Sequence, residues 1–286
     1  MKPLNPSGHH QLSRIALSRR QLLGGLAGLA AASSTAQAAP LFCPSQLNHV
    51  TLWVSDLERS RAFYRNLFGG PQWTVSPDAL CCFDLGANPL GLYLNPRGTP
   101  VGIDHFSIGL RDFDYDTALS TLKQQSMDTQ KAVNGVGIQL RDLDRIKVEL
   151  VPENYRNPTA EPQKGPQPPA QSLFRPVGLN HVTLQVANLE RATKFYESVF
   201  GPSFDGQRAQ TTTLRLGMGV LGLINYGVNP VGVDHFCVSV EGYEPDAVSE
   251  KLKQNGIPSQ RLYRPNQVFV RDPDGILVQL AGPGSA

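Results

Sequence analysis

The sequence predicts an α+β fold built from four similar βαβββ modules that are arranged in two pairs. The first observation is an internal repeat, because residues 48–69 and 180–201 are identical at 13 of 22 positions. Such self-similarity at a fixed offset indicates a duplicated unit. The second observation is that a strand pattern, a helix pattern and further strand patterns follow one another twice within each copy. The chain is therefore expected to contain four modules.

Composition and charge limit the classes of protein that this chain can be. Its 286 residues are 40% hydrophobic and 17% charged, which is typical of a soluble globular protein of one to three domains. The formal net charge of +2 depends on residues 1–38, which contain four basic and no acidic side chains, so the rest of the chain carries −2. Because no basic stripe remains, we expect neither nucleic acid nor anionic lipid as a partner.

Residues 1–38 resemble a twin-arginine signal peptide. A polar start leads to SRRQLL at residues 18–23, a modest apolar run at 22–32 and the small-residue site AQA at 36–38. A membrane anchor or an ordinary helix is the alternative, but the run is too short and too rich in Gly and Ala to span about 30 Å of hydrocarbon. The resemblance implies export by the twin-arginine machinery, which carries proteins that fold, often around a metal, before crossing. We therefore expect a periplasmic protein without stable membrane insertion of its mature chain.

The first module opens with a half-buried strand at residues 48–54. Val50, Leu52 and Val54 share one face of this strand, and His49 lies on the other face. A helix of about three turns is expected next, because Asp56 can cap its start and glycines follow its last apolar residue. Turn residues divide residues 73–94 into two or three antiparallel strands.

The other three modules repeat this order. The second has a strand at residues 103–110, a helix at 116–125 and strands at 137–141 and 146–151. The third has a strand around residue 181, a helix at 189–200 and strands up to 224, and the fourth has a strand at 233–238, a helix at 246–255 and final strands. Residues 153–177 are proline-rich without periodicity, which indicates a linker. The predicted domains are therefore 45–152 and 178–282.

Four histidines occupy equivalent places in the four modules. Outside the predicted signal segment the histidines are His49, His105, His181 and His235, each near the start of the opening strand of a module. A single histidine on a strand is more often structural than functional. Four at equivalent positions indicate one shared role, and metal ligation is a frequent role of neutral imidazole.

A carboxylate completes the set in the first half. Glu149 lies 44 residues after His105. Val148 and Leu150 beside it are expected to face the core, so Glu149 should face the histidines. Two imidazoles and one carboxylate from separate strands leave open positions on a divalent metal, an arrangement associated with non-haem Fe(II). A solvated glutamate on an amphipathic strand is the alternative.

The second half carries Gln279 at the place of Glu149. A neutral amide would hold a metal more weakly than a carboxylate does. The set of His181, His235 and Gln279 is therefore a second candidate site that is either vestigial or meant for a different ligand. Cys237, two residues after His235, is a minor candidate as a soft ligand. We expect the first half to be the catalytic one.

The four cysteines match no disulfide framework or zinc motif. We interpret them mainly as small buried apolar residues. A disulfide between Cys43 and either Cys81 or Cys82 is the alternative, because the predicted compartment is oxidising.

Three sequence motifs carry a resemblance to a known family. The module openings NHVTL(W/Q)V…LER…FY…FG and G(I/V)DHF and the closing RDPDGILVQL resemble the vicinal oxygen chelate superfamily, which includes glyoxalase I, extradiol ring-cleaving dioxygenases, fosfomycin resistance proteins and bleomycin-binding proteins. The resemblance covers residues 45–152 and 178–282. It implies that each pair of modules forms a curved mixed sheet around a metal-binding cleft, with His49, His105 and Glu149 at the ligand positions. Its members share this cleft and little chemistry.

Departures from the family pattern narrow the expected reaction. Glyoxalase I would supply a fourth ligand, usually Glu, from the closing strand of the first module, but residues 91–95 contain no acid. Three ligands favour the dioxygenase-like pattern. The extradiol enzymes also use additional histidines for proton transfer, and this chain has none to spare. Tyr93 could donate the proton instead, although most strand tyrosines are simply packed.

The sequence therefore predicts an exported metal-dependent enzyme, a dioxygenase-like oxidoreductase that acts on a small substrate with adjacent oxygens, such as a catechol. Fe(II) is the expected metal, with Ni, Zn or Mn as alternatives. A glyoxalase-like lyase or isomerase, or a small-molecule-binding protein for resistance or sequestration, are the alternative functions. Paired modules can complete their clefts within one chain, so either a monomer or a homodimer is compatible with the sequence.

Overall fold

The computed structural model describes residues 39–69, 72–76, 80–86, 88–94, 100–156, 161–162, 172–201, 204–227 and 230–284. The predicted signal segment, residues 1–38, lies outside this range. None of the helices in the described part of the chain has the length and hydrophobicity of a membrane span.

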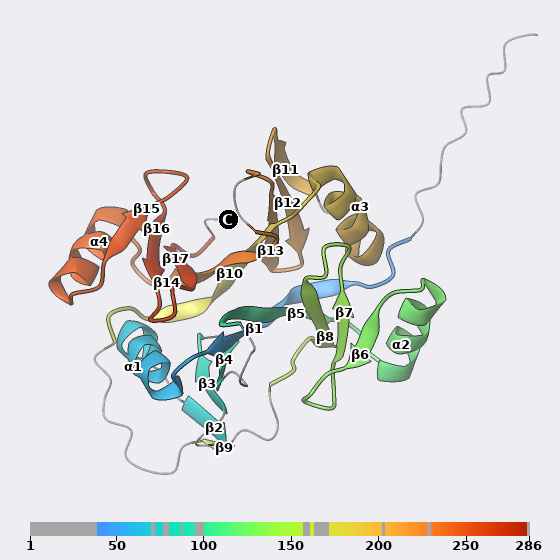
Figure 1. Ribbon diagram of the computed structural model, residues 1–286, viewed down its shortest axis with the longest axis horizontal. Helices are drawn as coiled ribbons and strands as arrows, with labels where there is room; N and C mark the ends of the chain where they lie inside the picture. Colours follow the sequence, from blue (N-terminus) through green and yellow to red (C-terminus); the bar gives the residue numbers. More distant parts are fainter. Residues whose placement is uncertain are drawn as a thin grey trace, which may run out of the picture. The chain divides into compact units, whose positions relative to one another are not determined.

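The first half of the chain forms one mixed sheet with two helices (Figure 1). Its elements are β1 (Pro44–Val54), α1 (Leu57–Phe68), β2 (Gln72–Ser76), β3 (Leu80–Asp84), β4 (Pro89–Leu94), β5 (Gly102–Leu110), α2 (Tyr115–Gln124), β6 (Thr129–Lys131), β7 (Ile138–Arg141), β8 (Lys147–Pro152) and β9 (Glu161–Pro162). The strand order is β6-β7-β8-β5-β1-β4-β3-β2-β9. Each module places its opening strand parallel to its last strand, and the opening strands β1 and β5 pair antiparallel at the centre.

The second half repeats this arrangement. Its elements are β10 (Pro176–Gln185), α3 (Leu189–Phe200), β11 (Phe204–Arg208), β12 (Thr211–Leu216), β13 (Gly219–Ile224), β14 (Gly232–Val240), α4 (Pro245–Gln254), β15 (Ser259–Arg261), β16 (Val268–Arg271) and β17 (Leu277–Ala281). The strand order is β11-β12-β13-β10-β14-β17-β16-β15, again with the two opening strands antiparallel at the centre. The predicted α+β class with four modules in two pairs is confirmed.

The local sequence signals place the helices closely. Asp56 caps α1 by accepting a hydrogen bond from the backbone N–H of Arg59 at 3.0 Å, and Gly69 ends the helix with a φ of 59° that other residues rarely adopt. The predicted helices at 116–125 and 246–255 are each displaced by one residue from the observed α2 and α4.

Three short strands were not located by the sequence patterns. β6 and β15 have three residues each, which is too short to show alternation. β9 lies in the predicted linker and extends the first sheet by pairing with β2. Residues 161–162 of the predicted linker therefore form an edge strand, a place in which a proline is tolerated.

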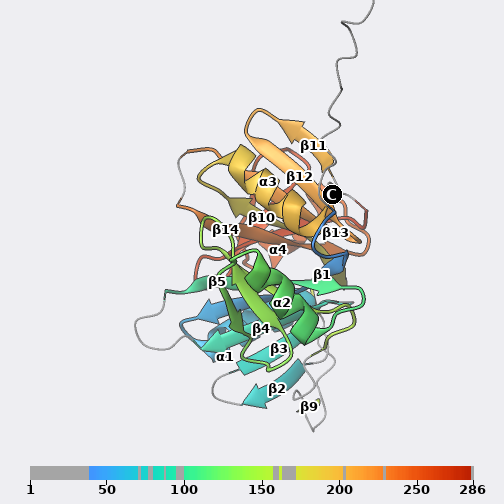
Figure 2. The same ribbon diagram turned by 90° about the vertical axis from the view of Figure 1, so that its right-hand side faces the viewer.

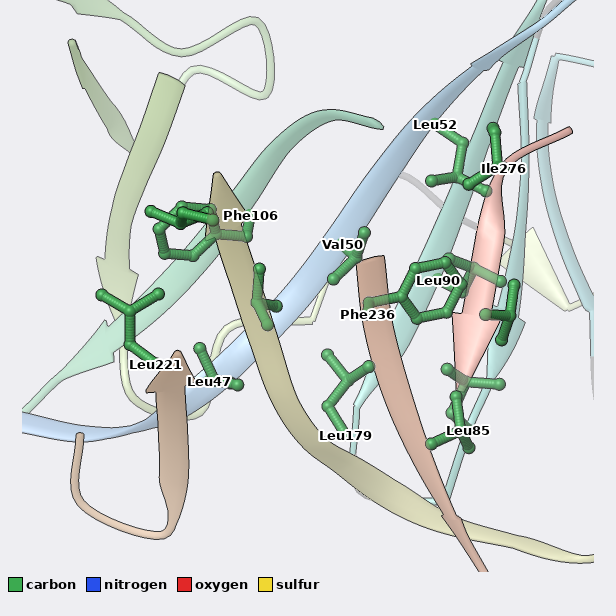
Figure 3. Packing of buried hydrophobic residues seen from close by; sticks show 14 of the residues in the cluster. Leu47, Val50, Leu52, Leu85, Leu90, Phe106, Leu179, Leu221, Phe236 and Ile276 are labelled. Carbon is green, nitrogen blue, oxygen red and sulfur yellow. The ribbon is translucent and has the colours of Figure 1, made fainter. Parts of the chain in front are cut away.

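The apolar faces of the two sheets pack against each other. Figure 3 shows Val50 of β1 beside Phe236 of the second half and Leu52 of β1 beside Ile276, and all of these side chains belong to one buried cluster. In Figure 2 the second sheet accordingly lies over the first. A fully buried side chain of this kind contributes about 1.5–3 kcal/mol. The core therefore lies between the sheets, and the opposite face of each sheet is free to line a cleft.

Two tyrosine–aspartate contacts join the halves. The hydroxyl of Tyr64 on α1 donates to Asp272 Oδ2 at 3.1 Å, in the turn between β16 and β17. The hydroxyl of Tyr196 on α3 donates to Asp142 Oδ2 at 2.8 Å, in the turn between β7 and β8. Burial raises the pKa of both tyrosines well above its ordinary value, so both phenols remain donors.

One arginine–aspartate ion pair lies beside each of these hydrogen bonds. Arg59 pairs with Asp274 at 2.8 Å, and Arg191 pairs with Asp144 in the equivalent turn. Each half thus uses its first helix to hold a turn of the other half, which makes residues 39–284 one packed unit with two sheets.

We expect Tyr64→Phe to lower the free energy of unfolding by about 1–3 kcal/mol, because it leaves a buried carboxylate oxygen without its donor. Tyr196→Phe should have a similar effect. Urea denaturation measures both. Tyr243→Phe is the matched control, because this hydroxyl makes an exposed hydrogen bond within one half to the Asn266 carbonyl. A cost of Tyr64→Phe that persists in full in an Asp272→Ala background would contradict the assignment, since the two effects should not add.

Candidate metal centre

Three neighbouring strands bring together the side chains that the sequence singled out in the first half. His49 lies on β1, His105 on β5 and Glu149 on β8. In the sheet, Thr51 lies opposite His105, and Ser107 lies opposite Glu149. Because residues two apart on a strand share a face, His49, His105 and Glu149 all lie on the face that is turned away from the core.

The three side chains are close enough to share one ion. Nε2 of His49 lies 3.3 Å from Nε2 of His105, and Nε2 of His105 lies 3.0 Å from Oε2 of Glu149. One ligand atom from each residue lies within 4.8 Å of the others. Among the residues that the structure describes, this is the one group of three His, Cys, Asp or Glu side chains with such geometry.

The hydrogen bonds of Asn48 fix the proton on His49. The Asn48 amide nitrogen donates to the backbone carbonyls of Glu153 at 3.4 Å and Tyr155 at 3.1 Å. Because carbonyls only accept, the Asn48 oxygen must be the atom that faces Nδ1 of His49 at 2.9 Å. Nδ1 therefore carries the hydrogen. Burial lowers the pKa of His49 to about 4, so the ring is neutral and its bare Nε2 points at the cluster.

His105 is oriented by a charged partner. Its Nδ1 lies 2.6 Å from Oδ2 of Asp104. Lys147 donates to Oδ1 of this carboxylate at 2.7 Å and to Oδ2 at 3.0 Å, and the Trp53 indole donates to Oδ1 at 2.7 Å. Burial alone would raise the pKa of Asp104, but its hydrogen bonds to His105 and Lys147 lower it, so this carboxylate is ionised. An ionised carboxylate on Nδ1 leaves Nε2 of His105 directed at the cluster.

Glu149 is held in place by two amides. Asn134 donates to Oε1 at 2.5 Å and Gln139 donates to Oε2 at 3.2 Å. Burial alone would raise the pKa of Glu149, but the hydrogen bond to His105 and the nearby imidazoles lower it to about 2. Gly137 makes room for this arrangement, because a Cβ there would lie 2.6 Å from Oε1.

The residues present fit a divalent metal. Two Nε2 atoms and one carboxylate oxygen converge, and each ligand is oriented by a second hydrogen-bonded partner. Burial alone would lower the pKa of His105, but its hydrogen bonds to Asp104 and Glu149 raise it. A proton shared by His105 and Glu149 can therefore take the place of a cation in offsetting the charge of the carboxylate. Three protein ligands of this type leave open positions on an iron-like metal.

A cavity of about 260 Å³ adjoins the cluster. Tyr93 of β4 lines it beside Trp53, with the two ring centroids 5.4 Å apart in an edge-to-face arrangement. Burial raises the pKa of Tyr93 above its ordinary value, so its hydroxyl is protonated at neutral pH. The structure thus places Tyr93 in the wall of the cleft, where the sequence predicted it.

Several residues around the cluster were not predicted as part of the site. Asp104 had a sequence signal, because Asp precedes His in the second module of each half. Lys147 had a weaker one, because it lies two residues before Glu149 and so on the same face of β8. Asn134 and Gln139 lie on a loop and an outer strand, and only the fold brings them to Glu149. Tyr155, whose ring centroid is 6.1 Å from that of His49, lies beyond the predicted domain end.

The second half brings its own candidate residues together in the same way. Nε2 of His181 lies 3.3 Å from Nε2 of His235 and 3.1 Å from Oε1 of Gln279. Cys237 lies opposite Gln279 in the sheet and is fully buried. Burial raises its pKa well above the ordinary value, and the protonated thiol is a poor metal ligand.

All four cysteines are free in the structure. Cys43 is exposed, whereas Cys81, Cys82 and Cys237 are buried. The alternative of a Cys43 disulfide is therefore wrong for this structure, and the interpretation as buried apolar residues holds for the other three.

A family model matches both halves of the chain, at residues 46–149 and 178–280. It describes the glyoxalase/bleomycin resistance protein/dioxygenase superfamily. The chain belongs to this superfamily. The two matches coincide with the two sheets, and His49, His105 and Glu149 all lie within the first of them.

Solved structures of extradiol dioxygenases have the same fold as this superfamily member. A variant of homoprotocatechuate 2,3-dioxygenase from Brevibacterium fuscum is 17% identical with a TM-score of 0.64, and the match covers 85% of this chain and 72% of that one. The 2,3-dioxygenase LapB from a Pseudomonas species is 16% identical with a TM-score of 0.63, over 85% of this chain and 94% of that one. No curated protein sequence matches significantly. At this identity the likeness shows the fold alone.

The difference between Glu149 and Gln279 allows a prediction of how many metal ions this superfamily member binds. We expect one divalent ion per chain, and Glu149→Gln should weaken its binding by about 100-fold or more, because it removes the charged ligand. Gln279→Glu alone should add no second ion, because Gln267 and Phe269 occupy the places at which Gly137 and Gln139 accommodate and support Glu149. Titration with Zn(II) measures both stoichiometries.

Glu58→Gln is the matched control for the loss of a carboxylate, because Glu58 is exposed on α1. An unchanged Zn(II) affinity in Glu149→Gln would show that the first cluster is not a metal centre.

Proposed function

We propose that the mature chain is a metal-dependent, dioxygenase-like oxidoreductase of the vicinal oxygen chelate type, which acts on a small substrate with two adjacent oxygens, such as a catechol. The observation that carries the proposal is the convergence of His49, His105 and Glu149 at the wall of a cavity. Membership in a superfamily that includes dioxygenases supports it.

The donor set favours Fe(II), since two histidines and one carboxylate with open positions are characteristic of non-haem iron oxygenases. The bound metal would supply Lewis acidity to adjacent substrate oxygens and the redox chemistry that reactions with dioxygen need. Ni, Zn or Mn in the same ligands would support a lyase or isomerase. The absence of an acid at the lining residues Gly91 and Tyr93 of β4 speaks for three ligands rather than four.

The cavity walls suit a planar aromatic substrate. Trp53, Tyr93 and Tyr155 line it. The hydroxyls of Tyr93 and Tyr155 are protonated at neutral pH, because burial raises the pKa of both. Tyr93 is the proposed proton donor to a substrate oxygen. Lys147 and Asp104 form an ion pair at 2.7 Å, and Asp104 in turn holds Nδ1 of His105, so that Nε2 of His105 faces the cluster.

We expect the Fe(II)-loaded protein to consume O₂ when it is given catechol. Glu149→Gln should lower kcat/KM at least about 100-fold, and Tyr93→Phe should lower kcat about 10- to 100-fold with little change in KM, because only proton transfer is lost. An oxygen electrode measures these rates. The exposed variant Glu58→Gln should have the parental rate.

The alternatives give different results in the same experiment. Turnover that persists without O₂ would identify a lyase or isomerase. Binding of the aromatic compound that survives a chelator, without turnover, would identify a binding protein. A purified protein that holds no stoichiometric metal would overturn the proposed metal centre itself.

We also propose that the chain is exported to the periplasm by the twin-arginine machinery, on the basis of SRRQLL at residues 18–23 and AQA at 36–38. Replacing both Arg19 and Arg20 by Lys should retain the precursor in the cytoplasm, because the signal is read through the arginine pair. Cell fractionation and the mass of the mature N-terminus check this. Arg14→Lys is the control and should leave export unchanged. Equal export of the paired variant would refute the route.

A further inference from the structure

The second half contains a cavity of its own, of about 380 Å³, beside His181, His235 and Gln279. Its walls differ in charge from those of the first cavity. Asp104, Lys147 and Glu149 line the first cavity, whereas Arg264 is the one Lys, Arg, Asp or Glu among the described residues that line the second. The second cavity therefore offers a positive charge at its wall and no carboxylate.

Four positions differ together between the two clefts. In the first cleft Asn134 and Gln139 donate to the Glu149 carboxylate, and Gly137 leaves room for it. The equivalent residues of the second half are Arg264, Gln267, Phe269 and Gln279. The loss of a carboxylate alone would leave its supporting amides in place. The concerted replacement of ligand and supports indicates a cleft built for a different ligand.

The imidazoles of the second cleft are satisfied without a cation. Nδ1 of His181 contacts the Asn180 amide at 2.8 Å, and the other end of this amide contacts the Ser239 hydroxyl at 3.1 Å. A hydroxyl both donates and accepts, so Asn180 can present either its oxygen or its nitrogen to His181. A neutral His181 can then carry its proton on Nε2 and donate it to Gln279.

An aromatic wall borders this cleft. The ring of Tyr263 stacks on that of Tyr226 at 5.7 Å and on that of His235 at 6.2 Å, and Phe269 contacts His235 edge to face at 5.2 Å. Tyr263 has a φ of 61°, a backbone conformation that costs a tyrosine energy. Its hydroxyl donates to Asp234 at 3.2 Å, which holds the ring over the cleft. The first half has the exposed Val133 at this position.

Arg264 and Gln267 at the wall carry polar groups without a partner within the described residues. The Arg264 side chain is exposed and makes no hydrogen bond or ion pair there, and it lies next to Tyr263 at the cavity wall. The side-chain oxygen of Gln267 is buried without a donor. An anionic group would pair with Arg264, and a ligand hydroxyl would satisfy Gln267.

We propose that the second cleft is a metal-free binding site for a small aromatic carboxylate, whose ring packs on the wall of Tyr226 and Tyr263 and whose carboxylate pairs with Arg264. The cavity is large enough for a single-ring compound. A divalent ion is disfavoured there because no carboxylate would offset its charge. The proposal does not depend on the chemistry of the first cleft.

Calorimetric titration of the EDTA-treated full chain with 4-hydroxybenzoate tests the site. We expect one equivalent to bind with a Kd below about 1 mM, and the neutral analogue 4-hydroxybenzamide to bind at least about 10-fold more weakly. Arg264→Gln should weaken 4-hydroxybenzoate binding at least about 10-fold, and Tyr263→Ala should weaken it similarly, because each removes one half of the recognition. Arg264→Lys should keep most of the affinity, which shows that charge is what matters.

Lys147→Gln is the matched variant of the first cleft and should bind the probe like the parent. The proposal is overturned if 4-hydroxybenzoate does not bind below about 10 mM, if Arg264→Gln binds it unchanged, or if Lys147→Gln loses it. It is also overturned if a second equivalent of Zn(II) binds to the parent and is lost in Gln279→Ala. If the first cleft binds no metal ion, the proposed enzymatic function is refuted, but the result expected for the titration with 4-hydroxybenzoate is unchanged.

Discussion

The alternation of side chains along the central strands is the constraint on which the rest of this structure depends. On β1, Val50 and Leu52 are fully buried against the other sheet, so the residues between and beside them must face the opposite side. A shift of one residue in the pairing of β1 with β5 would exchange these faces and expose the core residues to water. The packing energy of the core therefore fixes the register, and the register places Nε2 of His49 3.3 Å from Nε2 of His105. The metal ligands are rigid because they lie on strands that the core holds in place.

This origin of the site also explains what could be predicted from sequence. The ligands His49, His105 and Glu149 are on long strands with clear alternation, and the repeat tied each to an equivalent position, so face and spacing were readable without a structure. The residues that orient the ligands were not readable in the same way. Asn134 reaches Glu149 from a loop, and its place depends on a turn that no periodic pattern specifies. The strands β6 and β9 were missed for a related reason, since segments of three and two residues gain their structure from a neighbouring strand rather than from their own sequence.

Identical residues have different consequences in the two halves because their partners differ. Asn48 and Asn180 both contact Nδ1 of the histidine that follows them. Asn48 is bound to carbonyls, which can only accept, so its amide has one orientation and His49 has one tautomer. Asn180 is bound to the Ser239 hydroxyl, so both orientations are compatible with its hydrogen bonds. The first site is thereby preorganised to offer a lone pair to a cation, whereas the second can rearrange its protons and remain neutral.

The contacts between the halves explain why a second cleft can diverge while the second half is retained. Each sheet supplies the apolar surface that the other must bury, and each first helix holds a turn of the other half through Tyr64 and Asp272 or Tyr196 and Asp142. Loss of either half would expose the core of the partner, so both are needed for folding whatever they bind. The cleft faces carry no such requirement, because they point away from the shared core. Substitution at Arg264, Gln267, Phe269 and Gln279 therefore changes what the second cleft can bind at little cost to the packing on which the first cleft depends.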